Sequence, residues 1–281
     1  MRFGTFLYVD SQEHIDHLDA SMDWLREGGF ECCQVNWRVN ACMNDQAARK
    51  LRQTAQRAGI HLSGVSTFFD GVSRWNVVEG PMTVGLLPAD QRPMRLAHVL
   101  KTAAFCAQAG VTTLFGHLGY LPTNAFDLNY LGLVASLREI APRLKALGMR
   151  YLFETGQEPA VIFLRILEDV GADNLFINYD PANITMYGFG NPLDALSLYG
   201  RYVRGVHVKD GLLPTSGREL GKEMFLGTGR VDWPALLRML VKEYGFDGDL
   251  IIERQVDEAQ RQADVLLELS ILRRLAAQAG V

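Results

Sequence analysis

The segment Arg150-Tyr151-Leu152-Phe153-Glu154 decides the fold of this chain. It is a short apolar run that ends in a polar residue capable of binding a metal, and three later runs have the same form. The later runs, each with its final polar residue, are Leu175–Tyr179 with Asp180, Val203–Val206 with His207, and Leu250–Ile252 with Glu253. The four polar residues are 26, 27 and 46 residues apart (180−154, 207−180 and 253−207). Such intervals suit one strand, one helix and their loops. If the strands are parallel neighbours, the four side chains converge and form a set that would hold a divalent metal.

The rest of the chain repeats one unit, in which an amphipathic stretch is followed by glycine and then by a β-rich run. Glycine just past a helix is the usual left-handed stop, and the stops predicted here are Gly28-Gly29, Gly59, Gly110, Gly148, Gly171, Gly200 and Gly245. The predicted strands are Arg2–Tyr8, Cys32–Trp37, His61–Ser66, Val111–Gly116, Arg150–Glu154, Leu175–Asp180, Val203–Val208 and Leu250–Glu253. Eight strands alternating with helices predict an α/β fold, a single (β/α)8 barrel over residues 1–281. A doubly wound open sheet is the alternative, but no G-x-G-x-x-G follows the first strand.

The helices between the strands follow from apolar residues at helical spacing. The predicted segments are Gln12–Arg26, Pro93–Gln108, Tyr130–Leu147, Pro234–Tyr244 and Ala259–Ala277. In a barrel of this kind the active site lies at the carboxyl ends of the strands, so the four polar residues would point into one bowl. A single strand-end carboxylate is as often a helix cap or a loop charge. Four in succession favour a metal, since burying such charge unpaired costs several kcal/mol per ion.

Composition excludes several classes of protein. With 48% hydrophobic and 21% charged residues among 281, the chain is typical of soluble globular proteins. A formal net charge of −4 gives no basic surface for nucleic acid. The start Met1–Phe6 has no signal-peptide pattern and no apolar run is long enough to span a membrane, so we expect a cytoplasmic protein with no membrane partner. The cysteines, Cys32, Cys33, Cys42 and Cys106, form no CxxC pair and are expected to be buried hydrophobic residues.

Five segments carry a resemblance to a known family: Phe153–Glu158, Asn178–Asn183, Val206–Gly211, Leu226–Trp233 and Ile252–Arg254. In them the chain resembles the xylose-isomerase-like TIM-barrel superfamily, the sugar phosphate isomerases/epimerases. The resemblance implies one divalent ion, with Mn²⁺ as first choice and Mg²⁺, Co²⁺ or Zn²⁺ as others, held by Glu154, Asp180, His207 and Glu253. Three oxygen donors and one imidazole suit a fairly hard ion. Carboxylate charge of −3 against +2 leaves a site near −1, which suits a neutral or singly charged sugar.

The resemblance also implies an activity, that of a metal-dependent isomerase or epimerase of a ketose or keto-sugar derivative. In such enzymes the residues matching Glu154 and Glu253 are the acid and base on opposite faces of the sugar, and the metal stabilises the enediolate. Asn183 is a departure, because the epimerases usually have histidine there and an amide cannot carry a proton. A lyase or dehydratase acting on a keto-glycoside or keto-inositol is therefore the alternative. A non-catalytic metal-binding subunit and an endonuclease IV-like hydrolase follow, the latter disfavoured by only six histidines and a negative net charge.

Further residues are candidates for contact with the small-molecule sugar, and each has a structural alternative. Besides Asn183, they are Glu158, Lys209, Lys222 and His117. Glu158 also fits a T-x-x-E capping box that starts at Thr155. Lys222 lies in an insertion where a solvated lysine is common, and a lone histidine such as His117 is more often structural.

Three weaker expectations concern residues around the predicted site and the assembly of the protein. Asp210 would orient the imidazole of His207 or pair with Lys209. His61 is another histidine near a strand end, and an aromatic wall for a sugar would come from Trp37, Phe68, Phe69, Trp75 and Tyr120. Members of the family are commonly dimers or tetramers, so the resemblance also implies a homo-oligomer.

Overall fold

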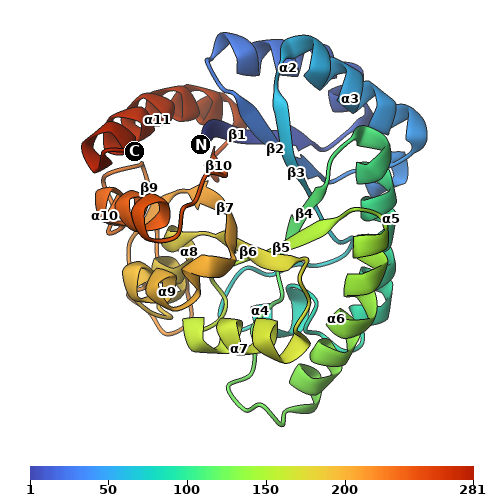
Figure 1. Ribbon diagram of the computed structural model, residues 1–281, viewed down its shortest axis with the longest axis vertical. Helices are drawn as coiled ribbons and strands as arrows, with labels where there is room; N and C mark the ends of the chain where they lie inside the picture. Colours follow the sequence, from blue (N-terminus) through green and yellow to red (C-terminus); the bar gives the residue numbers. More distant parts are fainter.

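Eight parallel strands close into a barrel in the computed structural model, which describes residues 1–281 (Figure 1). In order around the barrel they are β1 (Arg2–Val9), β10 (Asp249–Ile252), β7 (Val203–Val208), β6 (Leu175–Tyr179), β5 (Arg150–Glu154), β4 (Thr113–Gly116), β3 (His61–Ser66) and β2 (Cys32–Trp37). The predicted (β/α)8 barrel is confirmed, and every predicted strand is present with ends shifted by at most two residues. β5, β6, β7 and β10 are consecutive neighbours, which brings their polar ends together.

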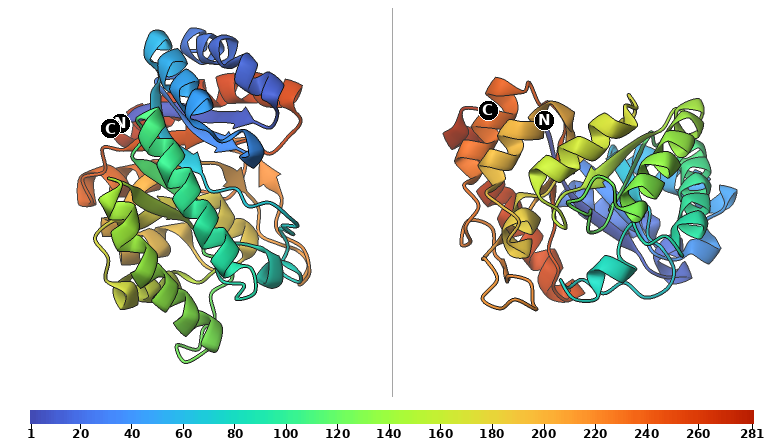
Figure 2. Two further views of the ribbon diagram at one scale, coloured as in Figure 1. Left: turned by 90° about the vertical axis from the view of Figure 1, so that its right-hand side faces the viewer. Right: turned by 90° about the horizontal axis from the view of Figure 1, so that it is seen from below.

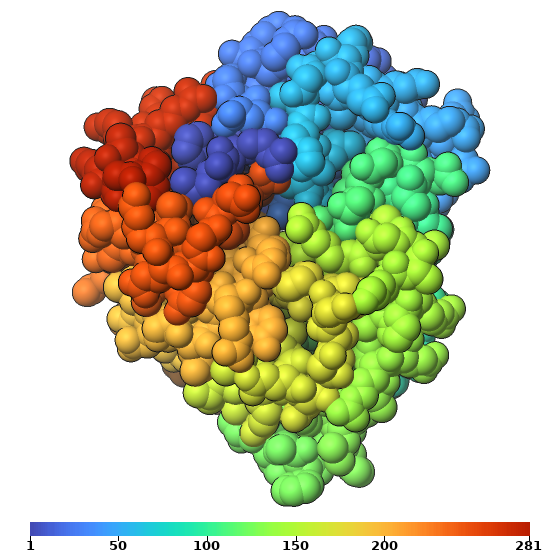
Figure 3. Space-filling view, viewed as in Figure 1, coloured from blue at the N-terminus to red at the C-terminus, as the bar shows by residue number.

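Helices cover the outside of the barrel, and the chain runs once around it, as the colours of Figure 3 show. The main helices are α1 (Gln12–Asp16), α2 (Leu18–Glu27), α3 (Asp45–Ala58), α5 (Arg92–Ala109), α6 (Leu128–Ala146), α7 (Ala160–Val170), α9 (Pro192–Tyr199), α10 (Trp233–Arg238) and α11 (Glu258–Ala279). Two predicted helices differ from the structure. The first is broken at His17. The fourth covers nearly the predicted range, but its second half, Met239–Glu243, is π-helical rather than α-helical.

The glycine stops behave as predicted at most positions. Gly59, Gly110 and Gly171 end α3, α5 and α7 with φ of 69°, 74° and 69°. Gly200 is the exception, because its φ of −53° is right-handed and a 3₁₀ turn, Gly200–Tyr202, follows. A Cβ at this position would collide with the ring of Tyr244, so close packing requires the glycine here rather than a left-handed turn.

The core has two layers. A large hydrophobic cluster fills the space between strands and helices, and a smaller one fills the barrel interior with Phe6, Cys32, Phe115, Leu152 and Ile251. All four cysteines are free. Cys32, Cys33 and Cys106 are buried as expected, whereas Cys42 is only partly buried. None of the helices has the length and apolar character required to cross a bilayer.

The two ends of the barrel differ. The chain termini lie side by side near one end (Figures 1 and 2). Long segments extend from the other end, where the strands finish (Figure 2, right). One follows β3 and contains α4 (Gly80–Thr83), and the other follows β7 and contains the β8 (Asp210–Gly211) and β9 (Glu223–Met224) hairpin. The strand ends beneath these segments carry the candidate site.

Candidate functional site

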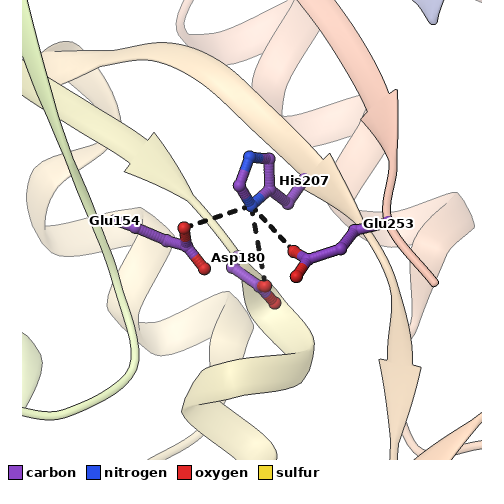
Figure 4. A group of neighbouring side chains, drawn as sticks. All are labelled: Glu154, Asp180, His207 and Glu253. Carbon is purple, nitrogen blue, oxygen red and sulfur yellow. Dashed lines mark ion pairs between the residues drawn. The ribbon is translucent and has the colours of Figure 1, made fainter. Parts of the chain in front are cut away.

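Glu154, Asp180, His207 and Glu253 meet at the carboxyl end of the barrel (Figure 4). All four are buried, and one potential ligand atom from each lies within 4.8 Å of the others. His207 Nδ1 is at the centre, 3.4 Å from Glu154 Oε2, 3.9 Å from Asp180 Oδ2 and 3.0 Å from Glu253 Oε2. The structure therefore brings together all four residues that the sequence singled out as ligands.

Several buried atoms of this cluster form no hydrogen bond of regular geometry within the protein, although charged atoms lie close to them. They include Asp180 Oδ2, His207 Nδ1 and Glu253 Oε2, and Lys209 Nζ lies 2.9 Å from the first and 3.2 Å from the last. Buried polar atoms without a regular hydrogen bond are rare in proteins. Here they face one another, so one cation among them would satisfy them together. The donor set of three carboxylates and one imidazole fits a divalent ion.

The second oxygen of each carboxylate is already held by the protein. Asn183 Nδ2 donates to Glu154 Oε1 at 2.8 Å, and the backbone N–H of Asn183 donates to Asp180 Oδ1, also at 2.8 Å. Gln255 Nε2 donates to Glu253 Oε1 at 2.8 Å. Each acid thus keeps one oxygen fixed and turns the other toward the cluster, which is the role of the outer partners around a metal site.

The imidazole of His207 is oriented in a similar way. Its Nε2 lies 2.7 Å from Oε1 of Gln34 on β2 and 2.7 Å from Nδ2 of Asn178 on β6, so these two side chains fix the ring with Nδ1 facing the carboxylates. Burial lowers the pKa of His207, but Glu154 and Glu253 outweigh burial and raise it to about 10. Burial raises the pKa of Asp180 to about 7. Without a metal the cluster therefore retains protons, which a bound ion would displace.

Lys209 is buried beside this cluster rather than exposed to substrate. Its Nζ lies 2.9 Å from Asp180 Oδ2 and 3.2 Å from Glu253 Oε2, and it does not line the cavity above the site. Burial lowers the pKa of Lys209, but Asp180, Glu253 and Glu154 together raise it well above its ordinary value. Lys209 is therefore a cation. With His207 neutral, three carboxylates and one ammonium give a net charge of −2, which a divalent ion cancels. This corrects the charge of about −1 expected from the sequence for the metal-bound site.

A cavity of about 450 Å³ opens over the cluster, with Glu154, Asn183 and Glu253 in its lining. This volume is typical of small-molecule sites. Its aromatic side chains are Phe6, Tyr8, Phe68, Phe69, Trp75, Phe115 and Tyr187. Of the expected aromatic wall, Phe68, Phe69 and Trp75 are present. Trp37 is fully buried against Phe105, and Tyr120 donates to the carbonyl of Asn76 instead.

His117 lines the same cavity. Its Nε2 lies 3.4 Å from Glu154 Oε2, and its Nδ1 lies 3.2 Å from Gln157 Oε1. The ring of Trp75 packs edge-on against it, with centroids 4.7 Å apart. The structure thus places His117 where a substrate bound over Glu154 would meet it.

Glu158 and Lys222 lie outside the cavity lining. Glu158 is buried, and burial raises the pKa of its carboxyl group well above the ordinary value. The capping box predicted for it is wrong, because α7 begins only at Ala160 and the hydroxyl of Thr155 bonds instead to the backbone of Asp180. Lys222 is exposed and directly precedes β9 of the hairpin.

Two other expectations are corrected. Asp210 contacts neither the imidazole nor Lys209, because its carboxylate accepts the backbone N–H groups of Gly227, Gly229 and Val231 at 3.0, 3.0 and 3.1 Å. It therefore holds the glycine-rich loop in place. His61 begins β3 and lies at the opposite end of the barrel, 3.7 Å from Asp249.

Gln34 and Gln255, which contact His207 and Glu253, were not predicted as site residues from the sequence. Gln34 could have been noticed as a polar residue within the apolar strand Cys32–Trp37. Gln255 follows Glu253 by two residues, and in extended chain such residues share a face. Both signals are weak without knowledge of which strands are neighbours.

Comparison with known proteins agrees with this geometry. The chain belongs to the xylose isomerase-like TIM barrel family, whose model matches residues 22–275. A xylose isomerase domain protein from Planctomyces limnophilus is 30% identical, with a TM-score of 0.88, and the match covers 99% of this chain and 98% of that one.

More distant structures share the fold. An L-ribulose 3-epimerase is 19% identical with a TM-score of 0.71, and the match covers 99% of this chain and 95% of that one. The 3-keto-D-glucoside 4-epimerase from E. coli is 14% identical with a TM-score of 0.70, and the match covers 98% of this chain and 99% of that one. No curated protein matches the chain.

Proposed function

We propose that this protein is a divalent-metal-dependent isomerase or epimerase of a ketose or keto-sugar derivative. The observation that carries this proposal is the placement of Glu154 and Glu253. They reach the cluster from opposite sides (Figure 4), and both line one cavity. Two bases on opposite sides of a substrate are what is needed to remove a proton from one face of a carbon and return one to the other.

In an isomerisation or epimerisation, substrate and product have the same atomic composition. One glutamate, as the carboxylate, takes a proton from the carbon next to the substrate carbonyl. The other glutamate must carry a proton at that stage and donates it to the opposite face, so one carboxyl group gains a proton and the other loses one. When bound, a divalent ion supplies a Lewis acid that stabilises the negative charge developing on the substrate oxygens. Asn183 and Gln255 hold the glutamates, each through Oε1, so that both carboxylates keep their orientation during proton transfer.

The comparisons support the choice of proton transfer, since two of the structures with this fold are named as sugar epimerases. A lyase is the second candidate, and the observation that favours it is His117. This imidazole lies in the cavity beside Glu154 and could protonate a leaving group, a step that epimerisation does not need.

The test is proton exchange with solvent. The Mn²⁺-loaded protein is incubated in D₂O with a panel of ketoses and 3-keto-glycosides, and the products are analysed by NMR and mass spectrometry. Deuterium next to the carbonyl without other mass change supports the proposal, whereas loss of water or aglycone indicates the lyase. Glu154→Gln and Glu253→Gln should abolish exchange. Glu139→Gln, at a residue with 76% of its side chain exposed, is the matched control. Absence of exchange across the panel would refute the proposal.

A further inference from the structure

Two arginines from opposite ends of the chain line the cavity that contains Glu154 and Glu253. Arg38 directly follows β2, and Arg261 lies in the first turn of α11. Both guanidinium groups pack on the ring of Tyr8, with Cζ atoms 5.0 Å (Arg38) and 4.0 Å (Arg261) from the ring centroid. The two Cζ atoms therefore lie at most about 9 Å apart, and both residues line the same cavity.

Arg261 has almost no partner within the protein. Its only hydrogen bond is a long one, 3.4 Å from Nη1 to the carbonyl of Val256, and it forms no ion pair. A guanidinium group has five N–H donors, so most of those on Arg261 remain available. Arg254 shows what a structural arginine looks like in the same region: it is buried and pairs with Glu223 and with Asp264 at 2.6 Å.

Arg38 is only partly satisfied. Its Nε lies 3.6 Å from Asp10 Oδ1 and 3.3 Å from Asn36 Oδ1, and 40% of its side chain is exposed. Glu258 lines a neighbouring groove together with Arg261 and forms no ion pair with it. Counting Asp10 against the two arginines leaves the lining of the cavity with one uncompensated positive charge at this point.

We propose that Arg38 and Arg261 form an anion-binding subsite, so that the substrate is an acidic sugar that carries a carboxylate or phosphate away from its carbonyl. The proposal rests on the function proposed above and specifies its substrate class. The metal end has no net charge once a divalent ion is bound, so the two arginines are the uncompensated cations that an anionic group in the cavity would meet. The planar guanidinium matches a carboxylate or phosphate through paired hydrogen bonds.

Three ketoses that differ only at carbon 6 test the proposal: D-fructuronate, D-fructose 6-phosphate and D-fructose. Their binding to the Mn²⁺-loaded protein is measured by isothermal titration calorimetry, and their proton exchange in D₂O by NMR. We expect at least one acidic sugar to bind about tenfold or more tightly than D-fructose. Arg38→Met and Arg261→Met should each remove most of this advantage of the acidic sugar over D-fructose. Arg261→Lys should retain part of it.

Arg274→Met is the matched control, because Arg274 is exposed on α11 and does not line the cavity. Preference for one acidic sugar over the other identifies the anion as carboxylate or phosphate. Equal binding of all three sugars, no binding of either acidic sugar, or an advantage that persists in the double variant would overturn the subsite. Exchange of D-fructose with no arginine-dependent preference leaves the proposed function standing without the subsite. Arginine-dependent binding with no exchange of any sugar leaves the subsite and rejects the isomerase.

Discussion

Replacing Lys209 with methionine tests the charge balance of the site. Lys209 Nζ is fully buried and contacts Asp180 at 2.9 Å and Glu253 at 3.2 Å. Removing one partner of a buried ion pair costs about 3–5 kcal/mol, because the other charge remains buried without compensation. In the metal-free protein, Lys209→Met should therefore lower the free energy of unfolding by that amount and the Tm by roughly 10 °C. Mn²⁺ should restore much of the loss, since the bound ion compensates the same carboxylates.

The assay is urea unfolding followed by circular dichroism, in EDTA and in excess Mn²⁺. The Mn²⁺-induced increase in stability should be larger for Lys209→Met than for the unchanged protein. Lys145→Met is the control, because Lys145 pairs with Asp173 at the surface with 61% of its side chain exposed, and such pairs contribute about 1 kcal/mol or less. If Lys209→Met costs no more than this control in EDTA, or if Mn²⁺ stabilises both proteins equally, Lys209 does not balance the charge of the carboxylates.

Three further outcomes are expected. Dialysis against EDTA should abolish proton exchange and addition of Mn²⁺ should restore it at about one ion per chain by elemental analysis; failure to take up metal contradicts the site. Asn183→Ala and Gln255→Ala should each slow exchange roughly tenfold or more, since each loses a hydrogen bond to a charged carboxylate, with metal content unchanged. Burial raises the pKa of Glu268 to about 8, so the folded protein holds a proton that the unfolded chain has released. The free energy of unfolding should therefore fall as pH rises from about 4.5 to 8, by up to about 1.4 kcal/mol per pH unit from this group. Glu268→Gln should flatten that slope when urea unfolding is compared at pH 6 and pH 8. An unchanged slope would refute the raised pKa of Glu268.

The fold and the four converging residues could be predicted because both follow from local pattern. Apolar runs and their glycine stops define the strands, and parallel order places residues such as Glu154 and Asp180 at one end of the barrel. The surroundings of the cluster could not be predicted in the same way. Gln34 reaches His207 across 173 residues of sequence, and this contact exists only because the barrel closes. Lysine is rarely buried, so nothing in the sequence alone predicts Lys209 beneath the ligands.

The capping box at Thr155 and Glu158 fails for a related reason. A local motif competes with contacts made by other segments, and here the hydroxyl of Thr155 binds the backbone of Asp180 on the next strand end. That contact ties the ends of β5 and β6 together, directly beside two of the ligands. Glu158 is left buried outside the cavity lining, and burial raises its pKa well above the ordinary value. The local tendency of Thr155 to cap a helix is therefore outweighed by its hydrogen bonds to the backbone of Asp180, which connect two strand ends beside the ligands.

Charge is distributed unevenly along the cavity, and this distribution has consequences for how a substrate lies in it. At the strand ends, Lys209 and a divalent ion balance three carboxylates, so no positive charge remains there for an anionic substrate group. Near Tyr8, Arg38 and Arg261 exceed their single acidic partner, Asp10. If the proposed anion-binding subsite is right, an acidic sugar is expected to lie with its carbonyl at Glu154 and Glu253 and its anionic group at the arginines. The preference for this orientation would come from the attraction of the arginines, because the metal-bound strand ends offer an anion no net attraction.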